Sequence, residues 1–472
     1  MHDRPVPRLR LLRGRGGLTG SPRALDYEGA VADLRRRGRF GISLGLERIA
    51  ALLDELGHPE RGLRGALVGG TNGKGSVVAL AGAVLHEAGV RVGSMPKPHL
   101  ITYRERIMVD GQMLAPADFG STIESVLLEA DRILDEAGPP TEFEVLTAAG
   151  FLALARANVD LALVEVGLGG RLDATNAADL GVAAITTVAH DHERHLGRTL
   201  AAIGGEKAAI IKSGDLAVTG ARGQGLGPIA ARCAALGVPL RRAGPGRAWE
   251  ARVMDSGWEG VVVDLRTPHG WVHDLRVGLL GSHQAANAAM AAALLDALRE
   301  DGERRGRPVS VSEESLRAGL AAARWPGRLE LFGAAAGGRD VLLDGAHNPA
   351  GARALTRALG ELGVRRFPLV FGAMRGKRVA SVLRALAPLE PLPVFTAVAD
   401  PHALPPDGLL RTWRRVAPHL RGAEAGTTAP TPDQALQRAA ALGPSAGPVV
   451  VAGSLYLVGA IRATLTGEQP DA

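Results

Sequence analysis

The chain has 472 residues, enough for two or three domains, and 46% of them are hydrophobic, as in an ordinary globular protein. Its one cysteine, Cys233, excludes an internal disulfide and a cysteine metal cluster, and it indicates a reducing compartment such as the cytoplasm. No apolar run approaches the length of a membrane span, so we expect no membrane partner.

The net charge of +6 is concentrated in the first 24 residues. Six arginines face one acidic residue there, Asp3, which leaves the rest of the chain nearly neutral. Nucleic-acid binding needs a basic face on the folded domain, so we expect no nucleic-acid partner. The segment lacks the apolar core of a signal peptide, and we expect residues 1–24 to be a disordered basic tail.

From residue 63 onward, short apolar runs alternate with amphipathic stretches, the pattern of an α/β fold in which helices cover a parallel sheet. The first set of predicted strands is 66–68, 90–93, 161–166 and 182–188, with helices near 77–88, 116–136, 143–157 and 199–212. Next come predicted strands at 260–265 and 271–277, an alanine-rich helix at 283–299, and a second α/β set with strands at 341–343, 369–371, 394–396 and 449–452.

Two breaks could separate these sets. The charged stretch 299–308 resembles a linker, but a predicted helix at 312–322 follows it, and Trp325-Pro326-Gly327 is an equally good break. We place a first α/β domain at 25–323, a linker at 324–328 and a second α/β domain at 329–472. A ligand cleft with a hinge is expected between them.

Residues 69–76 read Gly-Gly-Thr-Asn-Gly-Lys-Gly-Ser, between a predicted strand and a predicted helix. Such a loop turns backbone N–H groups toward phosphates, and its lysine reaches the outer ones. The common pattern has Ser or Thr directly after Gly-Lys, whereas here one glycine intervenes; a plain glycine turn is the structural alternative. We expect nucleoside triphosphate binding by six residues: Thr71, Asn72, Gly73, Lys74, Gly75 and Ser76.

Polar residues also follow two later strands, where ligands of such sheets gather. Glu165 ends an apolar strand and could hold the Mg²⁺ that bridges the phosphates, or it could form an ordinary salt bridge. Residues 190–195 contain three histidines, among them His192, which are either metal ligands or structural.

Lysine is rare, with five residues among 55 basic ones, so a retained lysine is expected where arginine cannot replace it. Lys207 lies among apolar residues on a predicted helix. A buried ammonium is costly. It must either pair with a carboxylate or react with CO₂ to give a carbamate, an anion that can bind metal.

The first strand of the second set ends in Asp344-Gly345-Ala346-His347-Asn348-Pro349. Asp, His and Asn at a strand end suggest a site, but Asx turns and helix caps use the same residues. Residues 283–287 open the alanine-rich helix, and Arg328 follows the second break.

Together these motifs resemble the Mur ligase superfamily and, within it, folylpolyglutamate synthase/dihydrofolate synthase. The match covers about residues 25 to 465. It includes the phosphate loop and residues 39–49, 98–100, 165–176, 191–197, 206–208, 283–287, 326–328, 344–349 and 453–459. The resemblance implies an N-terminal P-loop ATPase domain with a mostly parallel sheet and a C-terminal Rossmann-like domain.

The resemblance also implies an acyl-phosphate mechanism. The carboxylate of dihydropteroate or tetrahydrofolate would attack the γ-phosphate of ATP, and L-glutamate would capture the acyl phosphate. Two Mg²⁺ ions would assist, one held by Ser76 and Glu165 and the second by His192 and carbamylated Lys207. A monomeric enzyme with these small-molecule partners is expected.

The same resemblance implies residue roles. The catalytic residues would be Lys74, Lys207, Asp344 and His347; Asn287, Arg328 and Asp344 would contact the nucleotide; His347 and Ser454 would orient glutamate; Thr141, Phe143 and Asp173 would hold the pterin. This chain departs from the family in one place, because Pro96-Lys97 stands before Pro98 where Ser-Ser is common.

Two other functions remain possible at this point. A cell-wall Mur ligase would share the loop, Glu165, His192 and Lys207, but it needs a nucleotide-sugar domain before the loop, and only 68 residues precede Gly69. A nucleotide-binding module without ligase chemistry would have no use for the cluster at 344–347. The residues leave open whether the chain makes dihydrofolate, extends glutamate tails, or does both.

Overall fold

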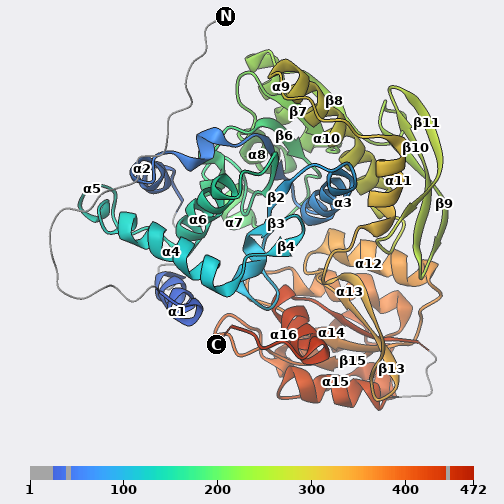
Figure 1. Cartoon of the computed structure of the whole chain (residues 1–472). Coiled ribbons are helices and arrows are strands. Elements are labelled where there is room, and N and C mark those ends of the chain that lie inside the picture. The colour runs from blue at the N-terminus through green and yellow to red at the C-terminus, as the bar shows by residue number, and fades with distance from the viewer. Residues whose placement is uncertain (1–24, 39–43, 443–446, 472) are drawn as a thin grey trace, which may run out of the picture.

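The computed structural model describes residues 25–38, 44–442 and 447–471. The predicted tail at 1–24 and residues 39–43 of the family match lie outside the described residues. In the described part, three sheets with their covering helices form two layered units, joined along one side (Figure 1).

The first unit is built on an eight-stranded sheet with the order β4-β3-β2-β5-β1-β6-β7-β8. Six neighbouring strands of this sheet are parallel, namely β2, β5, β1, β6, β7 and β8. The other two, β3 and β4, form an antiparallel hairpin at the edge beside β2. The strands are β1 Gly65–Gly69, β2 Val92–Met95, β3 Met108–Val109, β4 Gln112–Met113, β5 Leu161–Glu165, β6 Gly181–Ile185, β7 Leu216–Thr219 and β8 Leu240–Arg242.

The register of the central strands positions the site. Val68 of β1 pairs with Glu165 of β5, and Gly69 pairs with Ile185 of β6. All three strands therefore end at one edge, where the phosphate loop, Glu165 and the histidine-rich segment meet. This is the carboxyl edge, at which ligands of parallel sheets bind.

Alternate residues of β1 enter separate cores, as the pleat of a strand requires. Leu67 packs in a core with α1, α2, α4 and α6, while Val68 packs in a core with α3, α10 and α11. The helices of this unit are α1 Tyr27–Gly38, α2 Glu47–Glu55, α3 Lys74–Glu87, α4 Pro116–Ala130, α5 Leu134–Ala137, α6 Glu142–Arg156, α7 Glu193–Leu196, α8 Leu200–Ala208, α9 Leu226–Leu236, α10 Gln284–Arg304 and α11 Glu313–Ala322.

A three-stranded antiparallel sheet packs on α10 and α11. Its strands are β9 Glu250–Gly257, β10 Gly260–Thr267 and β11 Gly270–Val277. The sequence predicted two of these strands but not β9, because most side chains of β9 are exposed or half-buried and give no apolar run.

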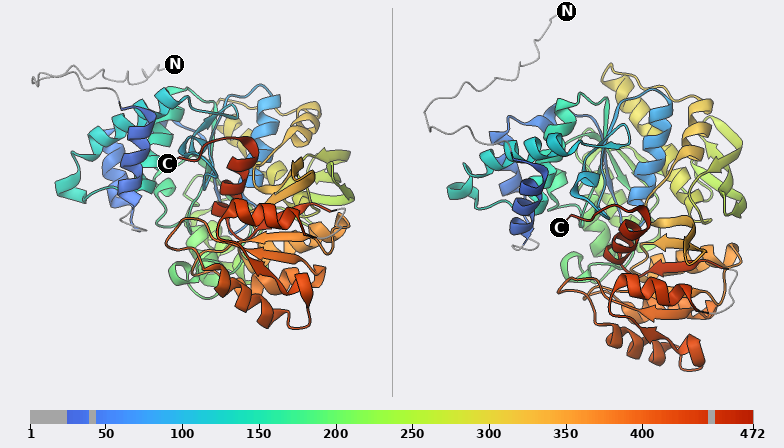
Figure 2. Two further views of the ribbon diagram at one scale, coloured as in Figure 1. Left: turned by 90° about the horizontal axis from the view of Figure 1, so that it is seen from below. Right: turned by 60° about the horizontal axis from the view of Figure 1, so that its bottom comes forward.

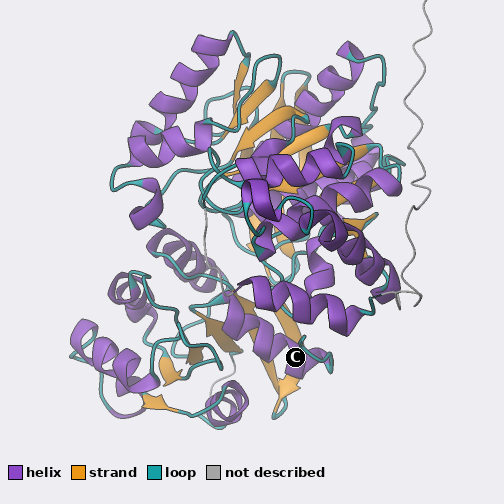
Figure 3. Ribbon diagram, turned by 90° about the vertical axis from the view of Figure 1, so that its left-hand side faces the viewer, coloured by secondary structure: helices purple, strands orange, loops and turns teal. Residues whose placement is uncertain are grey.

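The second unit has a six-stranded sheet with the order β12-β13-β17-β14-β15-β16, parallel except for β12. Helices surround the strands of this unit (Figure 3). Its strands are β12 Arg328–Ala336, β13 Arg339–Asp344, β14 Pro368–Phe371, β15 Leu392–Phe395, β16 Thr427–Thr428 and β17 Val449–Ala452. Its helices are α12 Pro349–Glu361, α13 Val379–Leu386, α14 Pro406–Val416, α15 Pro432–Ala440 and α16 Leu455–Thr466. The α/β Mur ligase fold predicted from the sequence is confirmed.

Several predicted limits were wrong. The stretch 299–308 is not a linker, because α10 continues to Arg304 with pairs such as Arg299 to Glu303 on its last turns. The predicted helix 116–136 is divided into α4 and α5, and α3 begins at Lys74, inside the loop. The limits of the domains stay a prediction, with the break at Trp325-Pro326-Gly327 lying between α11 and β12.

The C-terminal segment returns to the first unit, where Figure 2 shows it beside α1. The hydroxyl of Tyr27 donates to Asp471 Oδ1 at 2.7 Å, and the N–H of Tyr103 donates to Asp471 Oδ2 at 2.6 Å. The two units are therefore connected on this side as well as through 323–327. Among the described helices, none combines the length and the apolar character needed to cross a membrane.

Candidate functional site

The phosphate loop runs directly into α3, whose first residue is Lys74. Gly73 caps the helix at φ 86°, and a Cβ there would lie 2.5 Å from Asn287 Oδ1. The loop is fastened to the segment after β6, because the N–H of Asn72 donates to Thr187 Oγ1 at 3.0 Å. The first turn of α3 therefore begins at the carboxyl edge of the sheet. The free N–H groups of a helix start attract anions.

Gly75, the extra residue between Lys74 and Ser76, is required by packing. A Cβ at Gly75 would lie 2.5 Å from Cζ2 of Trp325, so the indole of the segment between the units rests on the start of α3. The unusual spacing of the loop therefore allows close contact with the predicted hinge.

Lys74 and Glu165 form the centre of the first wall. Lys74 Nζ donates to the carbonyl of Gly70 at 3.2 Å and lies 3.7 Å from Glu165 Oε1. Burial raises the pKa of the Glu165 carboxyl, and the charge of Lys74 opposes that rise. A buried carboxylate with one lysine at this distance retains acceptor capacity for a further cation, so Glu165 fits the Mg²⁺ role, and the hydroxyl-bearing Ser76 lines the same cleft.

Lys207 is buried on α8, with 3% of its surface exposed. Its Nζ donates to the carbonyl of Gly70 at 3.1 Å, and no carboxylate in the described part of the chain forms an ion pair with it. Burial, followed by the charge of Lys74, lowers the pKa of Lys207 to about 7. The salt-bridge alternative thus has no ion pair to support it among the described residues, and with a pKa of about 7 the amine is partly neutral at physiological pH, which is the form that reacts with CO₂.

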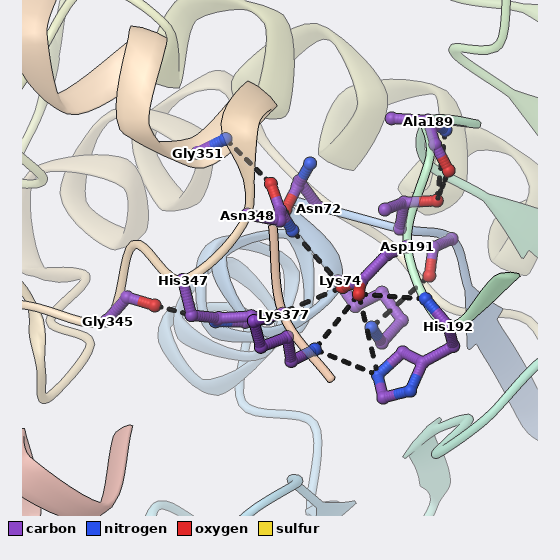
Figure 4. A network of polar contacts seen from close by, with 12 residues as sticks. Asn72, Lys74, Ala189, Asp191, His192, Gly345, His347, Asn348, Gly351 and Lys377 are labelled. Atoms are coloured by element: carbon purple, nitrogen blue, oxygen red, sulfur yellow. Dashed lines mark hydrogen bonds and ion pairs between the residues drawn. The ribbon is translucent and has the colours of Figure 1, made fainter. Parts of the chain in front are cut away.

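A polar network crosses between the units (Figure 4). Lys377 Nζ lies 2.9 Å from Asp191 Oδ1 and 3.3 Å from His192 Nε2, while His347 Nε2 lies 3.5 Å from Asp191 Oδ2. Asn348 Nδ2 donates to Asn72 Oδ1 at 3.0 Å. The segments 344–349 and 374–378 thereby face the phosphate loop and the segment after β6.

The charges of this network shift its pKa values. Burial lowers the pKa of His192 to about 4, with Lys377 as the next cause, so the ring is neutral at pH 7. The pKa of Asp191 lies well below its usual range, because hydrogen bonding to His347 and the charge of Lys377 outweigh its burial. A neutral imidazole is the form that binds metal. Within the described residues, however, no group of three or more His, Cys, Asp or Glu side chains is arranged to hold a metal ion.

In the cluster after β13, Asp344 accepts the N–H groups of Leu329 at 3.1 Å and Ala346 at 2.9 Å. Burial raises its pKa, and the charge of Arg328 opposes the rise. Asn348 caps α12 through the N–H of Gly351 at 2.8 Å. The cluster therefore contains a helix cap, Asn348, and also residues that line the cleft, such as Asp344 and His347.

The cleft between the two units has a volume of about 830 Å³. The predicted residues that line it are Thr71, Asn72, Gly73, Lys74, Gly75, Ser76, Phe143, Glu165, His192, Lys207, Asn287, Arg328, Asp344, His347 and Ser454. The structure thus brings together residues that are hundreds of positions apart in the chain.

Two predicted pterin residues do not line this cleft as the structure describes it. Thr141 forms a capping box with Glu144 at the start of α6, and Asp173 accepts the N–H of Leu168 at 2.8 Å and the hydroxyl of Thr175 at 2.6 Å. Thr141 therefore holds the first turn of α6, which carries Phe143. Direct pterin contact by Thr141 and Asp173 stays a prediction.

The sequence reasoning gave no role to Lys97, Asp191, Asn348 or Lys377. The rarity of lysine was a signal for two of them, Lys97 and Lys377. Four of the five lysines line the cleft: Lys74, Lys97, Lys207 and Lys377. The fifth, Lys212, donates to Asn176 Oδ1 at 2.8 Å instead.

Comparison with known proteins places this geometry in a family. Residues 68–295 match the Mur ligase middle domain, and residues 327–455 match the Mur ligase, glutamate ligase domain. The chain is 34% identical to the dihydrofolate synthase/folylpolyglutamate synthase of Bacillus subtilis over 80% of this chain and 86% of that protein. It is 36% identical to the Mycobacterium tuberculosis protein of the same name over 91% of each.

Solved structures agree. The Mycobacterium tuberculosis folylpolyglutamate synthase complexed with ADP superposes with a TM-score of 0.85 at 32% identity, covering 94% of this chain and all of that chain. The E. coli FolC in complex with DHPP and ADP gives a TM-score of 0.80 at 28% identity over 95% and 99% of the two chains. The chain therefore belongs to the dihydrofolate synthase/folylpolyglutamate synthase family of Mur ligases.

Proposed function

We propose that this chain is an ATP-dependent ligase that joins the carboxylate of a pterin-linked acceptor to the α-amine of L-glutamate. The proposal depends on one observation: two sets of polar residues face each other across one cleft. Lys74 and Glu165 lie on the side of the first unit, and the cluster from Asp344 to Asn348 lies on the side of the second. A plain nucleotide-binding module has no need of the second wall. The ADP and DHPP complexes of the relatives support both kinds of ligand.

The chemistry is an acyl transfer through phosphate. The acceptor carboxylate attacks the γ-phosphorus of ATP and ADP leaves, giving an acyl phosphate; the glutamate amine then attacks the acyl carbon, phosphate leaves and one proton is released. Lys74 and the N–H groups at the start of α3 would neutralise the phosphate oxygens, with Arg328 and Asp344 contacting the nucleotide from the other wall. Asn287, beside Gly73, would join them.

Two Mg²⁺ ions would supply further charge neutralisation at the phosphates. Ser76 and Glu165 would hold one, and His192 with carbamylated Lys207 would hold the other. The carbamate forms when the neutral Nζ of Lys207 adds to CO₂ and loses a proton. Its support is the buried Lys207, which lacks a carboxylate partner among the described residues and has a lowered pKa.

Phe143 would contact the pterin side of the acceptor, and His347 and Ser454 would orient glutamate, since all three line the cleft. Thr141 and Asp173 would hold the pterin with Phe143: Thr141 caps the helix that carries Phe143, and Asp173 accepts the N–H of Leu168, a residue that lines the cleft. We propose both acceptors, dihydropteroate and tetrahydrofolate, for a monomer that works in the cytoplasm, where ATP and glutamate are available.

The test is phosphate release by the purified protein with ATP, Mg²⁺ and either acceptor, with and without L-glutamate, and with the product identified by mass. Glutamate-dependent release with both acceptors is expected. Release that is independent of glutamate, or absent with every pterin carboxylate, would overturn the proposal.

A further inference from the structure

The ammonium of Lys97 is buried at the cleft without a hydrogen-bond partner among the residues that the structure describes. Lys97 follows β2, and its stem is half-buried and lines the cleft. Lysine heads ordinarily remain in water, and an unpaired one in a protein interior is costly. A cation in this position is expected to meet a partner that arrives with a ligand.

The neighbouring carboxylates are engaged elsewhere. Glu165 Oε2 accepts the main-chain N–H of Lys97 at 3.2 Å, and Glu165 Oε1 faces Lys74. Asp173 accepts the N–H of Leu168 through one oxygen, and the N–H and hydroxyl of Thr175 through the other. Both anions therefore contribute long-range attraction to Lys97 without bonding its Nζ.

An aromatic ring holds the ammonium in place. Nζ of Lys97 lies 4.4 Å from the centroid of Phe143, which also lines the cleft. The face of the ring stabilises a cation but supplies no hydrogen-bond acceptor of the usual strength. Lys97 thus lies between the residue proposed for the pterin and the carboxylate proposed for Mg²⁺.

Nearby cations increase the need for an anion. The charges of Arg106 and Lys74 both act unfavourably on the charged form of Lys97. Arg106 also lines the cleft, and its Nε donates to His99 Nδ1 at 2.9 Å rather than to a carboxylate. Burial is nevertheless the largest cost to the charge of Lys97, and a neutral carbonyl would satisfy its hydrogen bond but offset less of that cost than a carboxylate would.

We propose that Lys97 binds the carboxylate of the pterin-linked acceptor and directs it toward the phosphate loop. The inference rests on the proposed function and names the residue that selects an anionic acceptor. A carboxylate that must approach a triphosphate is repelled by it, and a fixed cation on the acceptor's side offsets part of that repulsion.

The test compares two ligands of nearly the same shape, one with a charged carboxylate and one with a neutral carboxamide. Pteroate and its carboxamide are titrated, in the presence of ADP, into the wild type and Lys97→Met, which keeps the length of the stem and removes the ammonium. We expect the wild type to prefer the carboxylate, and Lys97→Met to lose about tenfold or more of that preference. The affinity for ADP should not change.

Arg91→Met is the matched control, because it removes a positive charge from the exposed start of the same segment. It should keep the preference of the wild type. If Lys97→Met does not fold, Lys97→Gln provides the same comparison with a side chain that hydrogen-bonds without charge. An unchanged preference in a folded Lys97 variant, or a wild type that binds both ligands equally, would overturn the inference.

This readout requires no turnover. The inference can therefore fail while the wild type still releases phosphate in response to glutamate, and the proposed function can fail while the preference for the carboxylate persists.

Discussion

Lys377 Nζ lies 2.9 Å from Asp191 Oδ1, and this contact joins the unit built on the six-stranded sheet to the segment that follows β6 of the eight-stranded sheet. Both side chains are largely buried, with 19% and 11% of their surfaces exposed. A pair of this kind is screened less by solvent than a surface pair. It therefore holds the cleft in the arrangement described.

Replacing Lys377 should loosen the cleft. Lys377→Met leaves Asp191 without its cation, which should cost about 2 kcal/mol of the free energy of unfolding and lower kcat/KM about tenfold or more. Chemical denaturation and steady-state kinetics measure the two effects. Arg378→Met is the matched control, because its pair with Glu193 also crosses between the units but the arginine is mostly exposed. Equal effects of the two variants would contradict the role of Lys377.

Gly75→Ala should weaken ATP binding. The added Cβ would lie 2.5 Å from Trp325, so either the indole or the start of α3 must move. We expect the KM for ATP to rise several-fold and Gly75→Ala/Trp325→Ala to recover part of the loss. Gly82→Ala, in the same helix, would meet Leu163 only at 3.7 Å and should be neutral or stabilising by up to about 1 kcal/mol. A KM in Gly75→Ala equal to that of the wild type would contradict the packing argument.

The carbamate proposed at Lys207 predicts that arginine cannot replace the lysine. Lys207→Ala and Lys207→Arg should both lose about a hundredfold or more in kcat, as when one charge-stabilising group is removed from a transition state. A short carboxylate added to Lys207→Ala should restore part of the rate. Intact-mass measurement under CO₂ should detect the adduct on the wild type, and full activity of Lys207→Arg would exclude it.

His99 should make the fold sensitive to acid. Its burial, and then the charge of Arg106, lower its pKa from 6.5 to about 3, so the ring stays neutral in the folded state. The unfolded chain binds a proton as the pH falls below 6.5, and the stability present above that pH is lost progressively toward pH 3. The contribution amounts to about 1.4 kcal/mol between pH 7.5 and 5.5.

Denaturant unfolding at the two pH values measures this loss in the wild type and in His99→Gln, which should lack the His99 part. His269→Gln, at an exposed position between β10 and β11, should retain the pH dependence of the wild type. Equal pH dependence in the wild type and His99→Gln would show that the ring is not held neutral by the fold.

Sequence patterns within a short segment predicted those parts of the site that are formed by that segment alone. The strand, glycine loop and helix at 65–87 were recognisable because apolar periodicity and glycines act over a few residues. Glu165 and Asp344 were expected at strand ends, and the register of the sheets brings strand ends to one edge. The order of these motifs also predicted the family.

Contacts between distant segments were not predictable in the same way. Asn72 and Asn348 are hydrogen-bonded although 276 positions separate them. The resemblance implied that Thr141 holds the pterin, and the structure shows its hydroxyl in the cap of α6, a contact that the sequence analysis did not predict.

The sequence by itself determined that a phosphate loop, a strand-end carboxylate and a scarce lysine occur in the order of this ligase family. Only the tertiary structure decided which side chains share the cleft, that Lys207 is buried without a carboxylate partner among the described residues, and that Lys377 reaches Asp191. The physical reason is that burial and charge pairing depend on the packing of segments far apart in the chain, whereas motifs and periodicity depend on neighbours in sequence.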